Sequence, residues 1–431
     1  KGPFLYLIII IIFIQRLIYS NIPEVGRTGD TDGYIHAYDS GSIFEGYVSD
    51  LRPPVYTYFI KVVEKIGGEE NLEANVARAQ EILFFLSIIL FYSTIKLLTK
   101  NKLIICILTL IFGIAPSVII WNSFIVTESI TGLEMLFLTY ITIKYLKRPS
   151  KVLASLIGIV VLGMILTKPA FIYLLPIYIL FIVLKYFLNK EERKKIYFAA
   201  GSLAICCVAL VMYCLQMKNL YGVFGLTSVS SNNTMLSAIY SGSYLELKDN
   251  SIGKEIYNLA GEEPVTELET YEIYYDEIVN KYTSDEIKEF AKEAVKTNIY
   301  REYLINRFIN VGNENIGITY SNGEKSDEGT MYNFRSISGL IIPITFGFVY
   351  IILVVSIIYL IWYIIKYKEI NWICAFFTST IFANIVTLIF GAPFEEQRLF
   401  FPSMCLVLLY IGVIIGRIKL KDENLSTRKN A

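Results

Sequence analysis

The stretch Gly29–Ile60, GDTDGYIHAYDSGSIFEGYVSDLRPPVYTYFI, follows the first apolar segment of the chain and places charged side chains close behind it. That apolar segment, Phe4 to Tyr19, approaches the length of about 20 residues that a membrane-spanning helix needs. No small-residue cleavage site follows it, so we expect a retained anchor rather than a signal peptide. Charge beside a membrane span is costly unless it has a partner, which makes this stretch the first place to look for function.

The composition is typical of a membrane protein with several spans. Of the 431 residues, 54% are hydrophobic and only 18% are charged, which is below the charged fraction of most soluble domains. The formal net charge is zero and no basic patch carries interleaved aromatic residues, so we expect no nucleic-acid partner. The predicted fold class is an all-α multi-span membrane protein.

Ten segments are long and apolar enough to be candidate spans. They are Phe4–Tyr19, Ile82–Leu98, Leu103–Ile120, Phe124–Leu146, Val152–Thr167, Ala170–Leu188, Ile196–Gln216, Ser338–Ile365, Trp372–Phe390 and Leu399–Ile418.

Basic residues are concentrated in alternate loops, which predicts the orientation of the spans. Those loops read KLLTKNK, KYLKRPSK, KYFLNKEERKK and KYKE, and with Lys1 and the C-terminal tail they hold 20 of the 39 Lys and Arg residues. The intervening short loops contribute only Lys168 and Arg398. We therefore expect a multi-pass protein of the cell membrane with both termini in the cytoplasm.

This topology predicts three regions. Residues 1–216 form an N-terminal transmembrane module whose first external loop, residues 21–81, contains juxtamembrane helices. Residues 217–337 form an external, acidic and mostly helical segment, and residues 338–431 hold the last spans and a cytoplasmic tail. Apolar residues at near-helical spacing in the external segment predict a helix pair against the membrane surface. They are Ile287, Phe290, Ala291, Ala294, Ile299, Leu304, Ile305 and Phe308.

Charged residues from distant parts of the sequence converge on the predicted external side. They are Asp30, Asp32 and Arg52 after the first span, Glu128 and Glu134 in the fourth, Lys168 between the fifth and sixth, and Arg398 before the tenth. Four of them have a structural alternative: Lys168 and Arg398 as membrane anchors, Asp30 and Asp32 as helix caps. His36, the single histidine, is expected on the surface.

Several cations beside a carboxylate at a membrane face suit a lipid that carries a phosphate. The planar fork of an arginine bonds two phosphate oxygens at once. A nearby carboxylate can accept the proton of an incoming hydroxyl. The pattern thus indicates a cavity in which a phosphate is held and then leaves.

The order of several short motifs resembles the GT-C integral-membrane glycosyltransferases, which include the protein O-mannosyltransferases and the lipid A aminoarabinose transferases. The motifs are DTDGY, Gly46 and RPP in the first external loop, ANVARAQEILFFL, APSVIIWNSFIVTES, TKPAFIYLLP, FAKEAVKTNIYREYLINR and EEQRLFFPSMCLVLLY. The resemblance covers most of the chain. It implies a GT-C-like architecture with a polyprenyl-phosphate-linked sugar donor, an acceptor outside the cytoplasm and inversion at the anomeric carbon.

The resemblance also implies roles for individual residues. Asp30 corresponds to the catalytic base, with Asp32 and Glu128 as secondary candidates. Arg52 would bind the donor phosphate with help from Lys168 and Arg398, while Tyr34 and Tyr56 would line the donor pocket. Relatives that bind a divalent metal place an acid before the basic residue of the Pro-Pro motif, whereas this chain has Leu51. We therefore expect no metal and no other cofactor.

Two other classes stay open. A lipid-linked oligosaccharide polymerase or ligase also joins sugars outside the membrane, but uses basic residues of a later loop. A lipid flippase or transporter would show paired half-bundles, and no internal repeat is visible. The Ile, Lys and Asn richness is typical of an AT-rich bacterial genome, so the expected acceptor is a cell-envelope polysaccharide, a teichoic acid or a lipid-linked glycan.

Overall fold

The structure is a computed structural model, and it describes residues 2–19, 25–27, 29–39, 49, 52–115, 119–188, 193–262, 265–298, 349–391 and 400–415. Helices account for most of these residues. Within the described ranges the one strand-type pairing is an isolated parallel bridge between Gly26 and Phe124. The all-α prediction is therefore confirmed for the part of the chain that the structure describes.

The chain divides into two compact units. The first comprises residues 1–226, 317–383 and 401–431, and the second comprises residues 227–316 and 384–400. The helices that lie wholly or mostly in the first unit are α1 (Gly2–Tyr19), α2 (Gly29–Asp39), α3 (Pro54–Gly67), α4 (Leu72–Leu98), α5 (Lys102–Ile114), η2 (Ile120–Asn122), α7 (Glu128–Lys147), α8 (Lys151–Thr167), η3 (Pro169–Tyr173), α9 (Leu174–Leu188), α10 (Arg193–Tyr221), Val349–Tyr367, α18 (Trp372–Gly391) and Phe400–Ile415.

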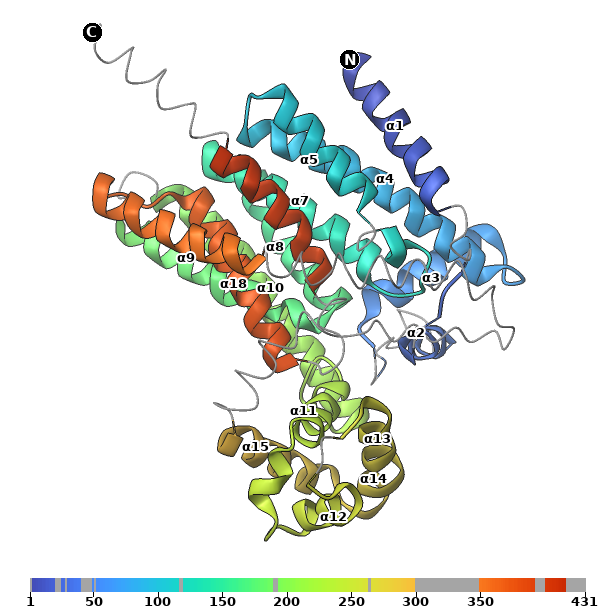
Figure 1. The fold of residues 1–431 in the computed structure, drawn as a ribbon. Helices are drawn as coiled ribbons and strands as arrows, with labels where there is room; N and C mark the ends of the chain where they lie inside the picture. Colours follow the sequence, from blue (N-terminus) through green and yellow to red (C-terminus); the bar gives the residue numbers. More distant parts are fainter. Residues whose placement is uncertain are drawn as a thin grey trace, which may run out of the picture. The chain divides into compact units, whose positions relative to one another are not determined.

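The long helices of the first unit pack against one another. Helix α4 packs on α5 and α7, α7 on α8, and α8 on α10, which also contacts α9 (Figure 1). Small residues allow close approach, as where Gly158 of α8 faces Ser202 of α10. The two helices of the predicted first external loop, α2 and α3, lie side by side, and α3 packs on α4 and α8 of this bundle.

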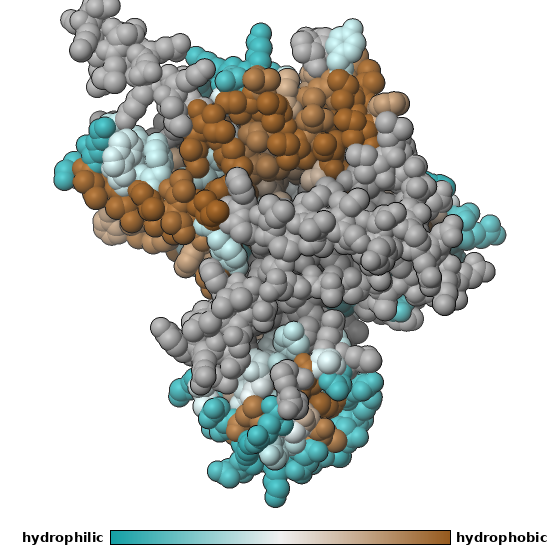
Figure 2. All heavy atoms as spheres, in the orientation of Figure 1, coloured by the Kyte–Doolittle hydropathy of each residue, from teal (hydrophilic) through white to brown (hydrophobic). Residues whose placement is uncertain are grey.

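Four of the described helical segments are long and apolar enough to cross a membrane. They are Leu72–Leu98, Pro169–Leu188, Ile196–Tyr221 and Val349–Tyr367. Five shorter apolar helices accompany them: Phe4–Gln15, Lys102–Ile114, Lys151–Thr167, Trp372–Thr387 and Phe400–Ile415. Large apolar side chains cover the outward faces of these helices, as Figure 2 shows. The chain is thus a multi-pass membrane protein by length and composition, and the count of ten spans stays a prediction.

Some helix boundaries differ from those predicted by hydropathy. Helix α4 begins at Leu72 rather than Ile82, because LEANVARAQE continues the helix without a breaker and buries Val76, Ala77 and Gln80. Helix α7 begins at Glu128 rather than Phe124. The four preceding residues cannot join it, because the backbone of Phe124 and Ile125 pairs with Gly26.

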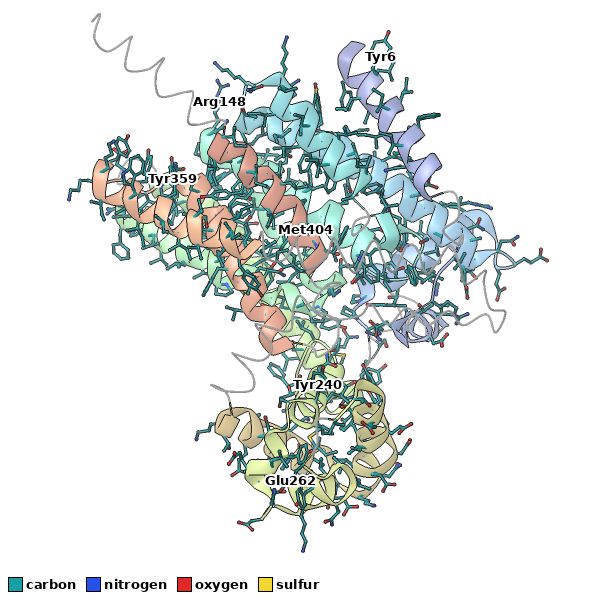
Figure 3. The ribbon with its side chains drawn as sticks, viewed as in Figure 1. Tyr6, Arg148, Tyr240, Glu262, Tyr359 and Met404 are labelled. Atoms are coloured by element: carbon teal, nitrogen blue, oxygen red, sulfur yellow. The ribbon has the colours of Figure 1, made fainter. Side chains whose placement is uncertain are left out.

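The N-terminal helix and the connection between α7 and α8 reach the same end of the first unit. Figure 3 labels Tyr6 on α1 and Arg148 just after α7, and both lie at the upper end of the bundle. This agrees with the placement of Lys1 and the KYLKRPSK loop on one membrane side. Which side is cytoplasmic stays a prediction.

The second unit is a small helical domain with its own apolar core. Its elements are α11 (Val229–Tyr240), η5 (Ser243–Leu247), α12 (Ser251–Ala260), α13 (Glu267–Glu272), the π-helical turn η6 (Ile273–Ile278), α14 (Val279–Lys281) and α15 (Ser284–Asn298). Ile287, Phe290, Ala291 and Ala294 of α15 are buried in this core. The prediction that they face the membrane surface is wrong, because α11 and η5 cover that face. Ile299, Leu304, Ile305 and Phe308 lie outside the described residues.

Candidate active site

Helix α2, which carries Asp30, is fixed to the segment that precedes α7. The amide of Gly26 donates to the carbonyl of Ser123 at 2.7 Å, and the amide of Ile125 donates to the carbonyl of Gly26 at 3.2 Å. The buried hydroxyl of Thr31 donates to the carbonyl of Ile125 at 3.3 Å. The first turn of α2 is therefore held against a loop about 94 residues later in the chain.

The Arg-Pro-Pro motif places Arg52 immediately before α3. Pro53 is extended, with φ −67° and ψ 159°, and Pro54 is the first residue of the helix. Proline suits this position because its fixed φ matches the helix and its missing N–H would have no partner there. The two prolines thus define where the Arg52 side chain leaves the backbone.

Asp30 and Arg52 form an ion pair between α2 and α3, here called the Asp30–Arg52 pair. Arg52 Nη2 donates to Asp30 Oδ1 at 2.5 Å, and the two side chains keep 17% and 21% of their surface exposed. The guanidinium also lies over the ring of Tyr34, with Cζ 4.6 Å from the ring centroid. Asp30 and Tyr34 are one helical turn apart, so one face of α2 supplies both contacts. The partial exposure leaves the pair accessible to a substrate.

Tyr34 rests on a second tyrosine that is fully buried. The rings of Tyr34 and Tyr56 meet edge to face, with centroids 4.8 Å apart. Burial raises the pKa of Tyr56 well above its usual value, and the neighbouring Tyr34 and Glu128 raise it further. Tyr56 therefore stays a neutral hydrogen-bond donor, and its hydroxyl donates to Gln80.

The sequence analysis did not identify Gln80, which holds this network together. Gln80 is completely buried in α4, and its side-chain oxygen accepts a hydrogen bond from the Tyr56 hydroxyl at 2.7 Å. Its amide nitrogen donates to the carbonyls of Asn122 and Phe124 at 2.9 and 2.7 Å. The available signal was a glutamine at the start of an apolar run in ANVARAQEILFFL. Its partners could not be read from the sequence, because they lie 24 to 44 residues away.

Glu128 and Lys168 form a second and deeper ion pair. Lys168 Nζ lies 2.6 Å from Glu128 Oε1, with the Glu128 side chain fully buried and that of Lys168 11% exposed. Glu128 is the first residue of α7, where the helix dipole favours a negative charge. Lys168 occupies the break between α8 and η3 that Pro169 enforces. One turn and a half deeper, Glu134 accepts a hydrogen bond from Thr167 at 2.9 Å.

Asp32 lies apart from these contacts. Its carboxylate pairs with Arg27, and 63% of the Asp32 side chain is exposed. Arg27 also pairs with Glu73 of α4, whose Oε1 is 2.7 Å from Arg27 Nη1. The sequence analysis also missed Arg27, which no motif distinguishes from an ordinary loop cation. This outward contact makes Asp30 the better candidate for a catalytic base.

Two residues of the predicted site lie outside the described residues, namely Arg398 and Leu51. The helix that follows Arg398 nevertheless contacts α7 close to Glu128. A Cβ atom at Gly132, one turn after Glu128, would lie 2.9 Å from the ring of Phe401. Phe401 is the second described residue after the gap at 392–399.

The arrangement can support transfer of a group from a phosphate. A carboxylate that can accept a proton and a guanidinium that can bind two phosphate oxygens lie in direct contact. A second cation is paired with a buried carboxylate in the same unit. Among the described side chains, no three of the His, Cys, Asp and Glu types gather closely enough to hold a metal ion. The expectation of a metal-free site stays a prediction.

Comparisons with known proteins agree with the motifs. Residues 51–213, which include Arg52, Tyr56, Glu128 and Lys168, match the model of the family described as dolichyl-phosphate-mannose-protein mannosyltransferase. The comparison with curated proteins gave no match.

Among solved structures, the chain is similar to two structures of the oligosaccharyltransferase of Archaeoglobus fulgidus. The first is the archaeal oligosaccharyltransferase AglB in complex with an inhibitory peptide and a dolichol-phosphate, with a TM-score of 0.53, 13% identity, and coverage of 99% of this chain and 52% of that one. The second, tethered to an acceptor peptide containing the NVT sequon, has a TM-score of 0.52, 14% identity, and coverage of 98% and 50%. The chain spans about half the length of these structures. The family match and the shared fold confirm the predicted resemblance: the chain has the GT-C fold of integral-membrane glycosyltransferases.

Proposed function

We propose that this chain is a membrane glycosyltransferase that moves a sugar from a polyprenyl-phosphate donor to an acceptor outside the cytoplasm. The observation that carries the proposal is the Asp30–Arg52 pair, which joins a base and a phosphate-binding cation at one partly exposed point. The Glu128–Lys168 pair supplies a second cation in the same unit.

Donor binding exchanges one partner of Arg52 for another. The donor phosphate competes with Asp30 for the guanidinium, whose fork can bond two phosphate oxygens at once. When Arg52 turns to the phosphate, Asp30 becomes available to the acceptor. The sugar then lies between them, with the acceptor hydroxyl on the side of Asp30.

The transfer is a single displacement. Asp30 accepts the proton of the acceptor hydroxyl. At the same time the oxygen of that hydroxyl bonds to the anomeric carbon, and the bond from this carbon to the phosphate oxygen breaks. The configuration at the anomeric carbon is inverted, and polyprenyl phosphate leaves. Arg52, Lys168 and Arg398 stabilise the charge that grows on the leaving phosphate, so they act most strongly in the transition state.

The remaining residues of the site have supporting roles. Glu128 holds Lys168 in the break between α8 and η3. Tyr34 and Tyr56 form the wall on which Arg52 rests and line the donor pocket. The acceptor is a cell-envelope polysaccharide, a teichoic acid or a lipid-linked glycan, and the site faces the external side of the cell membrane.

Incubation of the purified protein in bilayer nanodiscs with a panel of polyprenyl-phosphate sugars tests the proposal. Release of polyprenyl phosphate identifies the donor. Asp30→Asn should still bind that donor but transfer at least about a hundredfold more slowly, whereas Asp32→Asn should have a smaller effect. If no donor is consumed, the proposed function is wrong. If Asp32→Asn is the more damaging change, the base is misassigned.

The second candidate is transfer of a whole lipid-linked oligosaccharide, the class of reaction named for the structures that share the fold. The panel therefore includes donors that carry one sugar and donors that carry several. Consumption of the oligosaccharide donors alone would favour this alternative.

A further inference from the structure

Gly33 occupies an unexpected place in the middle of a helix. It is the fifth of the eleven residues of α2, and it is not among the glycines with positive φ. Glycine is a poor helix former, and an alanine would favour the helix at this position. The backbone therefore gives no reason for a glycine here.

The reason lies in the space that a side chain would fill. A Cβ atom at Gly33 would lie 2.9 Å from Arg52 Nε and 3.2 Å from Arg52 Nη2. Contacts under 3.0 Å essentially never occur for a real Cβ atom. The guanidinium thus lies directly over the bare backbone of Gly33.

The neighbours of Gly33 on the same face of α2 supply the two attractive contacts of the guanidinium. Asp30, three residues earlier, accepts its hydrogen bond at 2.5 Å, and the ring of Tyr34, the next residue, lies 4.6 Å from Cζ. The carboxylate of Asp30, the gap at Gly33 and the ring of Tyr34 lie on one face of α2. Together they form a surface that matches the flat fork of an arginine.

We propose that Gly33 is a positioning residue for Arg52, because its missing side chain lets the guanidinium lie between Asp30 and Tyr34. The inference deepens the proposed function, since it rests on Arg52 as the donor-phosphate ligand. It predicts a substitution that removes no charge and no hydrogen-bonding group, and yet impairs the reaction.

The expected signature of Gly33→Ala separates folding from function. The crowded atoms belong to the far end of a flexible side chain, so Arg52 can move aside and the protein should fold with little change in its unfolding temperature. The guanidinium, however, then leaves the line between Asp30 and Tyr34. Donor binding should weaken and transfer should fall by at least about tenfold, since misplacement by a fraction of an ångström is costly in catalysis.

Gly412→Ala is the matched control. Gly412 also lies inside a helix, and a Cβ atom there would lie 2.8 Å from the end of the Ile95 side chain. The substitution brings the same gain in helix propensity and the same degree of crowding, but against an apolar side chain of α4. Its transfer rate should equal that of the unmodified protein.

A double-mutant cycle with Arg52→Ala gives the decisive result. If Gly33 acts through Arg52, Gly33→Ala should slow transfer in the unmodified protein and cause no further loss beside Arg52→Ala. Equal loss in both backgrounds would overturn the proposal. Should Gly33→Ala fail to fold, recovery of folding in the double variant supports the proposal, and its absence overturns it.

A failure of the proposed function can be distinguished from a failure of the role proposed for Gly33. If the unmodified protein consumes no polyprenyl-phosphate donor, the same cycle is measured in unfolding temperature, where crowding between position 33 and Arg52 appears as coupling. Additive shifts in that measurement would overturn the role of Gly33 whatever the reaction.

Discussion

In the proposed reaction Arg52 binds two anions in succession, first the carboxylate of Asp30 and then the donor phosphate. Replacing it with alanine should weaken donor binding and also slow transfer by about a hundredfold, because the phosphate gains charge as the sugar departs. Lysine at this position should rescue only part of the loss, since it keeps the charge but not the fork or the stacking on Tyr34. Donor affinity and single-turnover rates measure the two effects. Full activity of the lysine variant would show that the fork is not used.

Transfer should survive an excess of a metal chelator. The expectation rests on Leu51 in place of an acid and on Arg52 and Lys168, the cations that we propose bind the phosphate. The assay compares transfer rates before and after chelation, with a known metal-dependent transferase as the control. Activity that is lost to the chelator and restored by a divalent cation would contradict it. Asp32 and Glu128 would then be the first ligands to test.

At this scale the sequence predicted residue types better than residue partners. The charged residues of DTDGY and RPP could be selected because charge near a span is expensive. That Asp30 contacts Arg52 while Asp32 contacts Arg27 could not be predicted. Both acids lie in the first turn of α2, and their partners depend on how α2 is oriented against α3.

Helix α4 supplies the buried amide that joins α3 to the loop before α7. Gln80→Leu removes three hydrogen bonds and leaves the Tyr56 hydroxyl and two carbonyls without that partner. At about 1 kcal/mol or more for each, the substitution should destabilise the protein by roughly 2–4 kcal/mol. Thermal unfolding in detergent measures the loss.

Ser93→Ala on the same helix provides the comparison. The Ser93 hydroxyl donates to the carbonyl of Ile89, one turn earlier, so its removal should cost no more than about 0.5 kcal/mol. Equal losses for the two variants would mean that the Gln80 contacts do not hold these elements together.

Helix positions followed from apolar runs, but helix ends followed from tertiary contacts. The apolar core of α4 was evident, whereas its first ten residues are amphipathic and hydropathy alone does not assign them to a span. The start of α7 depends on backbone pairing with Gly26, a contact between segments about a hundred residues apart. Such a pairing cannot be predicted from the local sequence, so the predicted start at Phe124 was four residues early.

The second unit depends on acidic helix caps, which make its stability sensitive to pH. Glu269 accepts from the amide and hydroxyl of Thr266, and Glu286 accepts in the same way from Thr283. These hydrogen bonds lower the pKa of both carboxylates. A lowered pKa in the folded state means that the stabilisation is complete above the usual carboxyl range and is lost as pH falls through the lowered pKa.

Hydrogen exchange on the full chain tests whether the caps lose their stabilising effect as pH falls. After correction for the intrinsic effect of pH, protection at the starts of α13 and α15 should fall between about pH 6 and pH 3. In a Thr266→Ala, Thr283→Ala double variant, protection should be lower at neutral pH and change less with pH. Protection that stays constant in the unmodified protein would contradict the role of the caps.

For the whole molecule, composition predicted the membrane class and charge asymmetry predicted a consistent topology. The fold of the acidic segment that we predicted to be external could be predicted only as mostly helical. The apolar stripe of α15 has the same period whether it meets a membrane or a protein core, and only the presence of α11 and η5 decides between them.

The bridge between Gly26 and the loop before α7 also sets the order in which the site can be assembled during biosynthesis. Thr31 and its partner Ile125 are separated by 94 residues, which take roughly 5–20 s to translate. A nascent chain that ends before this loop carries Asp30, Gly33 and Arg52, but lacks the backbone that fixes α2. The proposed site can therefore be assembled only after the segment leading into α7 has been made.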